Sequence, residues 1–288
     1  MRILRVFPRR TMATPDDGMV RIGYPDLFSP KCDEIHISVT FTYDIPEAEK
    51  MAEAWRSIAP VKMGGPALND KGNGFIPGQY LKTGYVITSR GCPNKCWFCM
   101  VPGREGNIRE LPIKDGWQVQ DNNLLACSKK HIQEVFAMLS CQPKRAVFQG
   151  GLEAARLEPW IAARLALLRP KSVYFAYDSP SDKDVLASAI SIMREVDYNW
   201  SHSISAYVLI GYPHDTFSSA EERLCFVLSL GVLPFAMLYR DEVGKVDQDW
   251  RKFQREWCRP KITGSKLRDI RTSTGMTARR ENEREETV

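Results

Sequence analysis

The sequence predicts an α/β fold in which a small α/β domain, residues 1–84, precedes a partial (β/α)6 TIM-like barrel, residues 85–240. Two observations lead to this prediction. Strand-like and helix-like segments alternate regularly through the second region, and a shorter strand–helix–strand unit of different texture occupies the first. The chain of 288 residues is long enough for a medium-sized domain with a small attachment.

The first region contains three apolar runs of strand length, at residues 3–7, 34–41 and 61–65. Residues 48–58 carry helical periodicity between the last two runs. A strand–helix–strand unit that ends in a glycine pair indicates a small open α/β layer. The polar, glycine-rich stretch at residues 69–74 is typical of a connection between domains.

The second region shows six strand-like segments, with helical segments between the later ones. Strands are expected at residues 85–89, 117–121, 146–149, 172–177, 204–210 and 235–239, and helices at 129–139, 159–168, 182–196 and 218–230. Alternation at this spacing predicts parallel strands joined by right-handed crossovers. Six strands are too few for a closed eight-stranded barrel, so we expect a partial barrel with its ligands at the carboxyl ends of the strands.

Residues 241–276 are expected to form a helical extension, and residues 277–288 a disordered charged tail. Within the extension, Trp250, Phe253 and Trp257 share one helical face. An amphipathic helix that docks on the barrel has this spacing. Aromatic rings beside cations also suit RNA, so a nucleic acid stays open as a substrate or partner.

The composition is that of an ordinary globular protein, with 43% hydrophobic and 26% charged residues. The net charge of +5 tolerates a polyanionic partner without demanding one. No apolar run is long enough to span a bilayer, and the N-terminus lacks the apolar stretch of a signal peptide. We therefore expect a cytoplasmic protein with no membrane partner, and the sequence does not indicate its oligomeric state.

The eight cysteines are expected to be reduced, because nothing in the sequence indicates secretion. Four of them are scattered and are expected to be small core residues: Cys32, Cys141, Cys225 and Cys258.

Cys92, Cys96 and Cys99 instead form a C-x3-C-x2-C cluster directly after the first strand of the predicted barrel. Three thiolates in one loop can ligate three irons of a 4Fe–4S cluster, whereas a cluster that only carries electrons normally takes four cysteines. One iron would therefore be left open.

This loop resembles that of the radical S-adenosylmethionine (SAM) superfamily, in which an aromatic residue, here Phe98, precedes the third cysteine. The resemblance implies a six-stranded partial barrel, a 4Fe–4S cluster on the three cysteines, and SAM bound to the open iron through its amino and carboxylate groups. It covers residues 64–239, and the segments at 121–126, 149–154 and 175–180 resemble an uncharacterised subgroup of the superfamily.

The first region resembles a shortened form of the Rossmann-like domain that precedes the barrel in cobalamin-binding members of the superfamily. In those proteins a Gly-Gly-Pro turn, here Gly64, Gly65 and Pro66, also closes a late strand. The Asp-x-His-x-x-Gly motif that offers a histidine to cobalt is missing from the sequence. We therefore expect a structural cap, and we do not expect cobalamin as a cofactor.

The ends of the second and third barrel strands supply four expected site residues. By the resemblance, the end of the second strand receives the methionyl ammonium of SAM, which gives this role to Asp121 and Asn122. A carboxylate is a suitable partner for an ammonium group. After the third strand, Gln149 and Glu153 are expected to face SAM or the substrate.

The fourth and fifth strands add two more residues. Asp178 is expected either to meet the SAM ribose or the substrate, or to cap the helix that follows. Gly211 resembles part of the family's adenine-contacting segment.

The resemblance implies an enzyme that reductively cleaves SAM to a 5′-deoxyadenosyl radical, with an electron from a flavodoxin- or ferredoxin-type donor, and abstracts hydrogen from a substrate. The substrate is not indicated. A tRNA- or nucleic-acid-modifying enzyme is one alternative. The non-catalytic alternatives are a zinc site completed by Cys127 or His131, and an iron–sulfur protein in which Cys127 is the fourth ligand.

Overall fold

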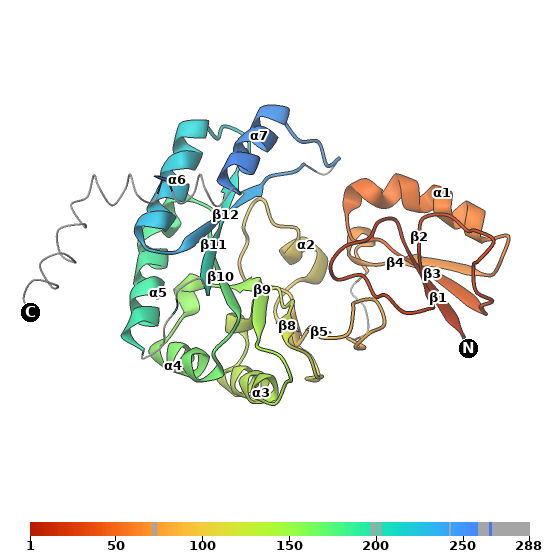
Figure 1. The fold of residues 1–288 in the computed structure, drawn as a ribbon, viewed down its shortest axis with the longest axis horizontal. Coiled ribbons are helices and arrows are strands. Elements are labelled where there is room, and N and C mark those ends of the chain that lie inside the picture. The colour runs from red at the N-terminus through yellow and green to blue at the C-terminus, as the bar shows by residue number, and fades with distance from the viewer. Residues whose placement is uncertain (71–73, 197–199, 201–202, 242, 259–264, 267–288) are drawn as a thin grey trace, which may run out of the picture.

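The computed structural model describes residues 1–288 except 71–73, 197–199, 201–202, 242, 259–264 and 267–288. Two parallel β-sheets, each with its own hydrophobic core, organise the chain (Figure 1). The predicted tail and most of the second half of the predicted C-terminal extension lie outside the described residues.

The N-terminal sheet has four parallel strands in the order β2-β1-β3-β4. Their bounds are β1 (Ile3–Phe7), β2 (Val20–Ile22), β3 (Glu34–Ser38) and β4 (Val61–Gly64). Three of them confirm predicted strands, while β2 was not predicted. The helix α1 (Ile45–Trp55) follows β3, slightly earlier than the sequence indicated.

The two faces of the N-terminal sheet are covered differently. Alternating apolar side chains such as Leu4 and Ile35 form a core with Met51 and Trp55 of α1, all of them 0% exposed. This burial follows from the period-2 pattern of the strands and the helical period of α1. On the opposite face Arg5 donates to Gly78 O and Gln79 O at 3.0 and 2.9 Å, so residues 78–80 cover that side.

The second sheet has six parallel strands whose spatial order follows the chain without reversal: β5-β8-β9-β10-β11-β12. Their bounds are β5 (Tyr85–Val86), β8 (Gln118–Val119), β9 (Val147–Leu152), β10 (Ser172–Tyr177), β11 (Ile204–Ile210) and β12 (Leu233–Leu238). All six predicted strands are confirmed, and so is the α/β class.

Four helices connect the later strands, close to the predicted bounds: α3 (Lys129–Ser140), α4 (Pro159–Leu168), α5 (Lys183–Glu195) and α6 (Phe217–Ser229). The side chains of Ser128 and Thr216 accept N–H bonds that begin α3 and α6, and Pro159 occupies the first turn of α4. Right-handed crossovers between strands in sequential order place every connecting helix on the same face of the sheet. Figure 1 shows these helices along one side.

This arrangement gives the six-stranded sheet a buried outer face and an open inner face. Outward side chains such as Phe148, Phe175 and Val208 are at most 1% exposed and pack in one core with the helices. The alternating residues of β12 point inward, and among them Phe235 and Met237 are 44% and 41% exposed. Side chains on the inner face are therefore available to a ligand.

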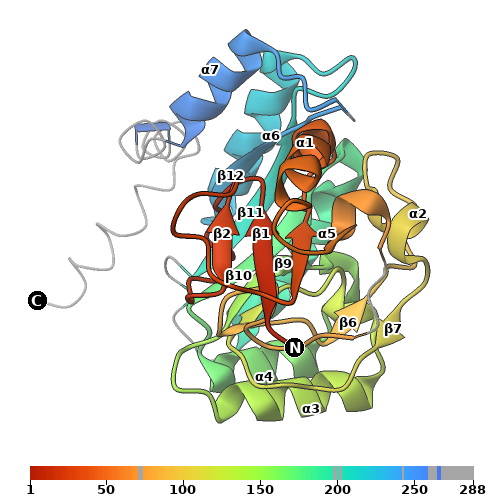
Figure 2. The same ribbon diagram turned by 90° about the vertical axis from the view of Figure 1, so that its right-hand side faces the viewer.

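The N-terminal domain lies beside the six-stranded sheet in Figure 1 and in front of it in Figure 2. Tyr43, in the 3-10 turn that precedes α1, packs against the segment after β12, where Arg240 lies 5.5 Å from its ring centroid. Gly244 is so close that an added Cβ would be 2.6 Å from Tyr43 Cδ1. The N-terminal domain thus contacts the loop that follows β12, one edge strand of the larger sheet. In the chain, the same domain precedes β5, the other edge strand.

The C-terminal extension contains α7 (Gln248–Trp257), whose aromatic face packs onto the six-stranded unit. Trp257 is 3% exposed, and Trp250 lies 4.3 Å from Phe217 between ring centroids. The docking interpretation of this helix is confirmed, so its rings are not an open platform for RNA. In the described part of the chain, no helix is both long and apolar enough to cross a membrane.

Candidate functional site

The cysteine loop lies between the two strands of a short hairpin beyond the carboxyl end of β5. Strand β6 (Ser89–Arg90) pairs antiparallel with β7 (Arg109–Glu110), and α2 (Val101–Glu105) lies between them in the chain. Gly91 has φ +88°, and an added Cβ would lie 2.2 Å from Asn107 O. Only glycine fits at this point, so the backbone enters the cysteine loop in one fixed direction.

Backbone hydrogen bonds also fix the cysteines themselves. The Cys92 N–H donates to Gly106 O at 3.1 Å, and the Cys99 N–H donates to Cys96 O at 3.0 Å. Cys96 is exposed, whereas Cys92 and Cys99 are half-buried. Burial raises the pKa of the Cys96 and Cys99 thiols, and the neighbouring thiols add to the rise, so the three groups lie within electrostatic reach of one another.

The three thiols share a loop without forming a closed set of ligands. Over the described ranges, no group of three His, Cys, Asp or Glu side chains is gathered closely enough to hold a metal ion. Binding a cluster therefore requires the thiols to turn toward one another. Rotation about their side-chain bonds can provide this, because one thiol is exposed and the other two are only half-buried.

Asp121 holds the chain that leads into the cysteine loop. It is 2% exposed, and its Oδ1 accepts the Thr88 N–H at 2.6 Å. Its Oδ2 accepts the hydroxyls of Thr88 and Ser89 at 2.5 and 2.8 Å. Burial raises the pKa of Asp121, while these hydrogen bonds oppose the rise. Both oxygens are thus already engaged, and the carboxyl anchors the segment between β5 and the cysteines.

The two asparagines that follow Asp121 also touch the loop. Asn122 Oδ1 accepts the Gly91 N–H at 3.0 Å. Asn123 is 4% exposed, and its Nδ2 lies 3.4 Å from Cys92 Sγ and 2.6 Å from Glu153 Oε2. Among the described residues, the buried Oδ1 of Asn123 has no hydrogen-bond partner. This oxygen lies beside the first cysteine and can accept a hydrogen bond from a ligand bound there.

Gln149, on β9, faces the inner side of the sheet. Its side-chain oxygen accepts from Gln120 Nε2 at 3.1 Å, and its backbone oxygen accepts the Tyr207 hydroxyl at 3.0 Å. The structure therefore connects Gln149 to the residue that follows β8 on one side and, across β10, to β11 on the other. Its amide lies on the inner face, and its expected contact with SAM or the substrate stays a prediction.

Glu153 accepts hydrogen bonds from Asn123 and, at 2.7 Å, from Arg156 Nε. Gly150, three residues before Glu153, has a packing function, because an added Cβ there would lie 2.1 Å from Asp121 O. Close approach of two strand ends thus requires glycine at this position. Glu153 is connected to the cysteine loop through Asn123, whose Nδ2 also lies beside Cys92 Sγ.

Asp178 lies after β10 and does not cap the following helical turn. That function belongs to Ser179 and Asp182, which form a capping box, so the capping alternative is wrong. Burial, and then the charge of Asp182, raise the pKa of Asp178 to about 6. The carboxyl also contributes to the raised pKa of Cys96 and of Cys99, which places it within electrostatic reach of the cysteine loop.

Gly211, after β11, packs against α7. Its φ is +71°, and an added Cβ would lie 2.9 Å from the ring of Trp250. Its N–H donates to Asp215 Oδ2 at 2.9 Å. The structure thus explains this glycine by packing, and the expected contact with adenine stays a prediction.

The aromatic residues of the cysteine loop extend toward the ends of β11 and β12. Trp97 is 62% exposed, and its ring centroid lies 5.7 Å from that of Tyr212 and 5.8 Å from that of Tyr239. Phe98 meets Trp97 edge-on at 5.4 Å. The loop therefore spans from the first strand of the sheet to the last two.

The inner face of the sheet carries a second group of rings. Tyr174 and Tyr207 stack with centroids 4.7 Å apart and an interplanar angle of 9°. Phe235 meets Tyr207 edge-on at 5.5 Å. These rings lie on the exposed face whose carboxyl-terminal end is occupied by the cysteine loop, so they can form the floor of a substrate site.

A buried carboxylate close to the loop was missed by the sequence reasoning. Glu105 is 3% exposed and lies between three arginines, 3.3 Å from Arg104, 3.1 Å from Arg109 and 3.6 Å from Arg90. One negative charge against three positive charges leaves this cluster cationic. The three arginines at positions 90, 104 and 109 surround the cysteine loop in the sequence, and this concentration of positive charge could have indicated an acidic partner such as Glu105.

The alternative fourth ligands have other contacts. Burial raises the pKa of the Cys127 thiol to about 11, and its side-chain hydrogen bond is with Ser89. His131 is 5% exposed, and its Nδ1 lies 3.8 Å from Glu110 Oε2. Two further cysteines predicted to be core residues, Cys141 and Cys258, are exposed, so that prediction is wrong for them.

Comparison with models of known protein families finds no match, and comparison with curated proteins finds no match either. A proposed function therefore has to follow from three features of the chain itself. These are the cysteine loop, the buried polar groups that hold it and the open inner face beneath it.

Proposed function

We propose that this chain is a radical SAM enzyme in which Cys92, Cys96 and Cys99 hold a 4Fe–4S cluster. When bound, the cluster and SAM supply reductive cleavage of SAM to a 5′-deoxyadenosyl radical, which abstracts hydrogen from a substrate. The observation that carries the proposal is the position of the C-x3-C-x2-C loop at the carboxyl end of the first of six parallel strands in sequential order. Parallel α/β folds bind their ligands at that end.

We interpret the six-stranded sheet as a partial (β/α)6 barrel. Sequential strand order with helices on one face is the arrangement that curls into a barrel. The cysteine loop supports this interpretation, because Trp97 reaches Tyr212 and Tyr239 at the far end of the sheet. A flat sheet would keep the first strand distant from the last two.

The donor set and its surroundings fit both cofactors. Three thiols suit three irons, and the cationic cluster around Glu105 offsets the negative charge that thiolate ligation brings to the loop. For the SAM ammonium, Asp121 and Asn122 are less suitable than expected, because Asp121 already accepts from Thr88 and Ser89 and Asn122 already accepts the Gly91 N–H. Asn123 Oδ1 is the free acceptor, and we transfer this role to Asn123, assisted by Glu153.

Other residues of the chain would orient SAM and the substrate. Asp178, with its raised pKa of about 6, can donate as a neutral acid or accept as a carboxylate when it meets a ribose hydroxyl. Gln149 and the rings of Tyr174 and Tyr207 line the inner face where the substrate would lie. The exposed side of Cys96 is where a flavodoxin- or ferredoxin-type donor would approach.

The test is anaerobic reconstitution of the full chain with iron and sulfide. We expect about four irons and four sulfides per chain and an EPR signal of the reduced cluster that changes when SAM is added. The variant Cys127→Ser should keep both the cluster and its response to SAM. A colourless protein with one zinc would contradict the proposal, and loss of the cluster in Cys127→Ser would support a four-cysteine electron carrier instead.

A further inference from the structure

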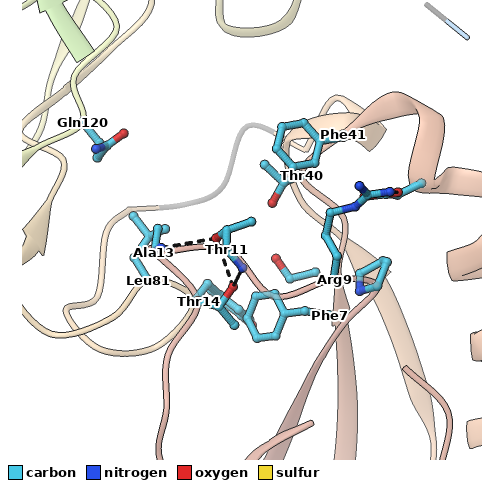
Figure 3. Close-up of a pocket in the computed structure, with 13 residues that line it drawn as sticks. Phe7, Arg9, Thr11, Ala13, Thr14, Thr40, Phe41, Leu81 and Gln120 are labelled. Atoms are coloured by element: carbon cyan, nitrogen blue, oxygen red, sulfur yellow. Dashed lines mark hydrogen bonds and ion pairs between the residues drawn. The ribbon is translucent and has the colours of Figure 1, made fainter. Parts of the chain in front are cut away.

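The N-terminal sheet has a ligand crevice of its own. Its strand order β2-β1-β3-β4 reverses between β1 and β3, and open α/β sheets bind ligands outside the carboxyl ends of the strands at such a point. A cavity of about 160 Å³ lies there (Figure 3). Its lining includes residues between Phe7 and Thr14, at and after the end of β1, residues between Ser38 and Asp44, at and after the end of β3, and Tyr80 and Leu81. The function proposed above gives this cavity no role.

The lining of this cavity combines aromatic rings with hydroxyl groups. Phe41 supplies a partly exposed aromatic ring, Phe7 lines the cavity but is only 5% exposed, and Thr11, Thr14 and Thr40 supply hydroxyls that can donate or accept. The Thr11 N–H donates to Thr14 Oγ1 at 2.8 Å, and the two hydroxyl oxygens are 3.0 Å apart, so this side of the cavity is preformed. Figure 3 shows Thr40, which follows the neighbouring strand β3, reaching toward the cavity.

The charges around the cavity balance. Arg9 Nε donates to Asp44 Oδ2 at 2.7 Å, and Arg9 Nη2 donates to the other oxygen of the same carboxylate. The guanidinium also lies 4.9 Å from the centroid of Tyr43. Because the cation is held by Asp44, the cavity suits an uncharged group. Arg10 and Arg240 are exposed nearby and can meet a phosphate outside it.

The far wall of the cavity belongs to the other sheet. Gln120 lines it and donates to Gln149 on the inner face, and Gln120 directly precedes Asp121. A group bound here would therefore lie beside the substrate floor of the barrel. About 160 Å³ suits a single ring system, since sites for drug-sized ligands measure roughly 300–1,000 Å³.

We infer that this cavity binds a nucleobase of the substrate. Bases are recognised by stacking on aromatic rings and by hydrogen bonds from hydroxyl and amide side chains to their polar edges, and this lining supplies both. The N-terminal domain is then the substrate-recognition domain, and the substrate is a free nucleotide or a nucleotide within a strand. The role as substrate rests on the proposed function, whereas base binding does not.

The test measures binding to the full chain before reconstitution, using ribonucleoside 5′-monophosphates, a mixed-sequence single-stranded RNA and ribose 5-phosphate. Saturable binding of monophosphates identifies free nucleotides, and binding of RNA alone identifies a strand; both support the inference. Thr40→Val should weaken that binding about five- to tenfold, while the exposed Thr83→Val should leave it unchanged.

Three outcomes would overturn the inference: no binding at millimolar ligand, equal binding of ribose 5-phosphate, or equal affinity of folded Thr40→Val and the parent protein. Because the cluster is not needed, the two proposals fail separately. Formation of 5′-deoxyadenosine without nucleotide binding refutes the cavity alone, and nucleotide binding without an iron–sulfur cluster refutes the enzyme alone.

Discussion

The two sheets of this protein present different chemistry at the same structural position. Beyond the carboxyl end of the six-stranded sheet lie three thiols, buried carboxyls and a cationic cluster. Beyond the carboxyl end of the four-stranded sheet lie hydroxyls, aromatic rings and an internally neutralised ion pair. Parallel strands open a crevice in both cases, and the loop residues decide what it can do. One edge suits a redox cofactor, and the other suits recognition of a neutral ring.

The comparison also shows where each edge obtains its rigidity. Around the cysteine loop, buried carboxyls connect separate segments: Asp121 accepts from the Thr88 N–H and from two hydroxyls, and Glu105 meets arginine side chains on both strands of the hairpin. Around the N-terminal cavity, short local contacts such as that between Thr11 and Thr14 hold the backbone. Substitutions at the first edge should therefore affect folding and cofactor loading together, whereas those at the second should mainly affect binding.

The largest expected effect is a complete loss of cluster loading at one edge, with no change in ligand binding at the other. Cys96→Ala should abolish cluster loading, measured as iron and sulfide per chain, because two thiols cannot hold the cluster. Binding of nucleotides by the N-terminal cavity should stay unchanged. Cys141→Ala is the matched control, since Cys141 is an exposed cysteine at the end of α3. Full iron content in Cys96→Ala would contradict the assignment of this loop.

Asp121→Ala tests whether rigidity of the cysteine loop depends on the buried carboxyl. The change leaves the Thr88 N–H and two hydroxyls without their acceptor, so the free energy of unfolding should fall by about 3 kcal/mol. Chemical denaturation measures this. The exposed Asp115→Ala should change stability by less than about 0.5 kcal/mol. Equal stability of the two variants would exclude the anchoring role.

Gly150→Ala tests the packing explanation of the glycine pair. An added Cβ would lie 2.1 Å from Asp121 O, so the strand ends must separate, and we expect a loss of about 2 kcal/mol or more in thermal or denaturant unfolding. Gly103→Ala is the control, because nothing lies within 4 Å of its added Cβ. If Gly150→Ala were as stable as this control while losing its response to SAM, contact with the cofactor would explain the glycine better.

Asp178→Asn should change stability in the opposite direction, and only at a pH at which the carboxyl is ionised. The folded-state pKa of Asp178, about 6, lies above its ordinary value of 3.8, so the folded protein binds the proton more tightly. Stability from this group is therefore greatest at low pH and falls as the pH rises from about 4 to about 6. At pH 7 the asparagine variant should be more stable by about 2–3 kcal/mol.

The measurement is the free energy of unfolding of the unreconstituted protein at pH 4 and pH 7. Asp182 and Arg223 act on the same carboxyl, and Cys96 and Cys99 lie within its electrostatic reach, so the difference between variant and parent is the quantity to follow. Equal pH dependence in both proteins would show that Asp178 is not held in a desolvated position.

Periodicity was sufficient to predict most of the fold. The helix at Pro159–Leu168 was located to the residue, and all six strands of the larger sheet were identified, because hydrophobic period and breakers mark such segments strongly. Strand β2 (Val20–Ile22) was missed because three residues carry too little pattern. Because β2 was not predicted, the reversal of strand order at the N-terminal crevice could not be predicted either.

The site was less predictable, because its roles depend on contacts between distant segments. Asp121 was expected to meet SAM, but Thr88 and Ser89 occupy its oxygens, and no spacing rule shows that pairing. Asn123 was overlooked for the same reason, since its free acceptor appears only once burial and partners are known. The cysteine loop was recognisable because its three cysteines lie within eight residues of sequence.

The most direct test of the central claim is a single product assay. The reconstituted, anaerobic protein is incubated with SAM and dithionite, and 5′-deoxyadenosine is measured by mass spectrometry against the Cys96→Ala variant. The proposed function predicts 5′-deoxyadenosine from the parent protein and none above background from the variant. A fully loaded, SAM-responsive cluster that yields no 5′-deoxyadenosine, or equal yields from the two proteins, would contradict it.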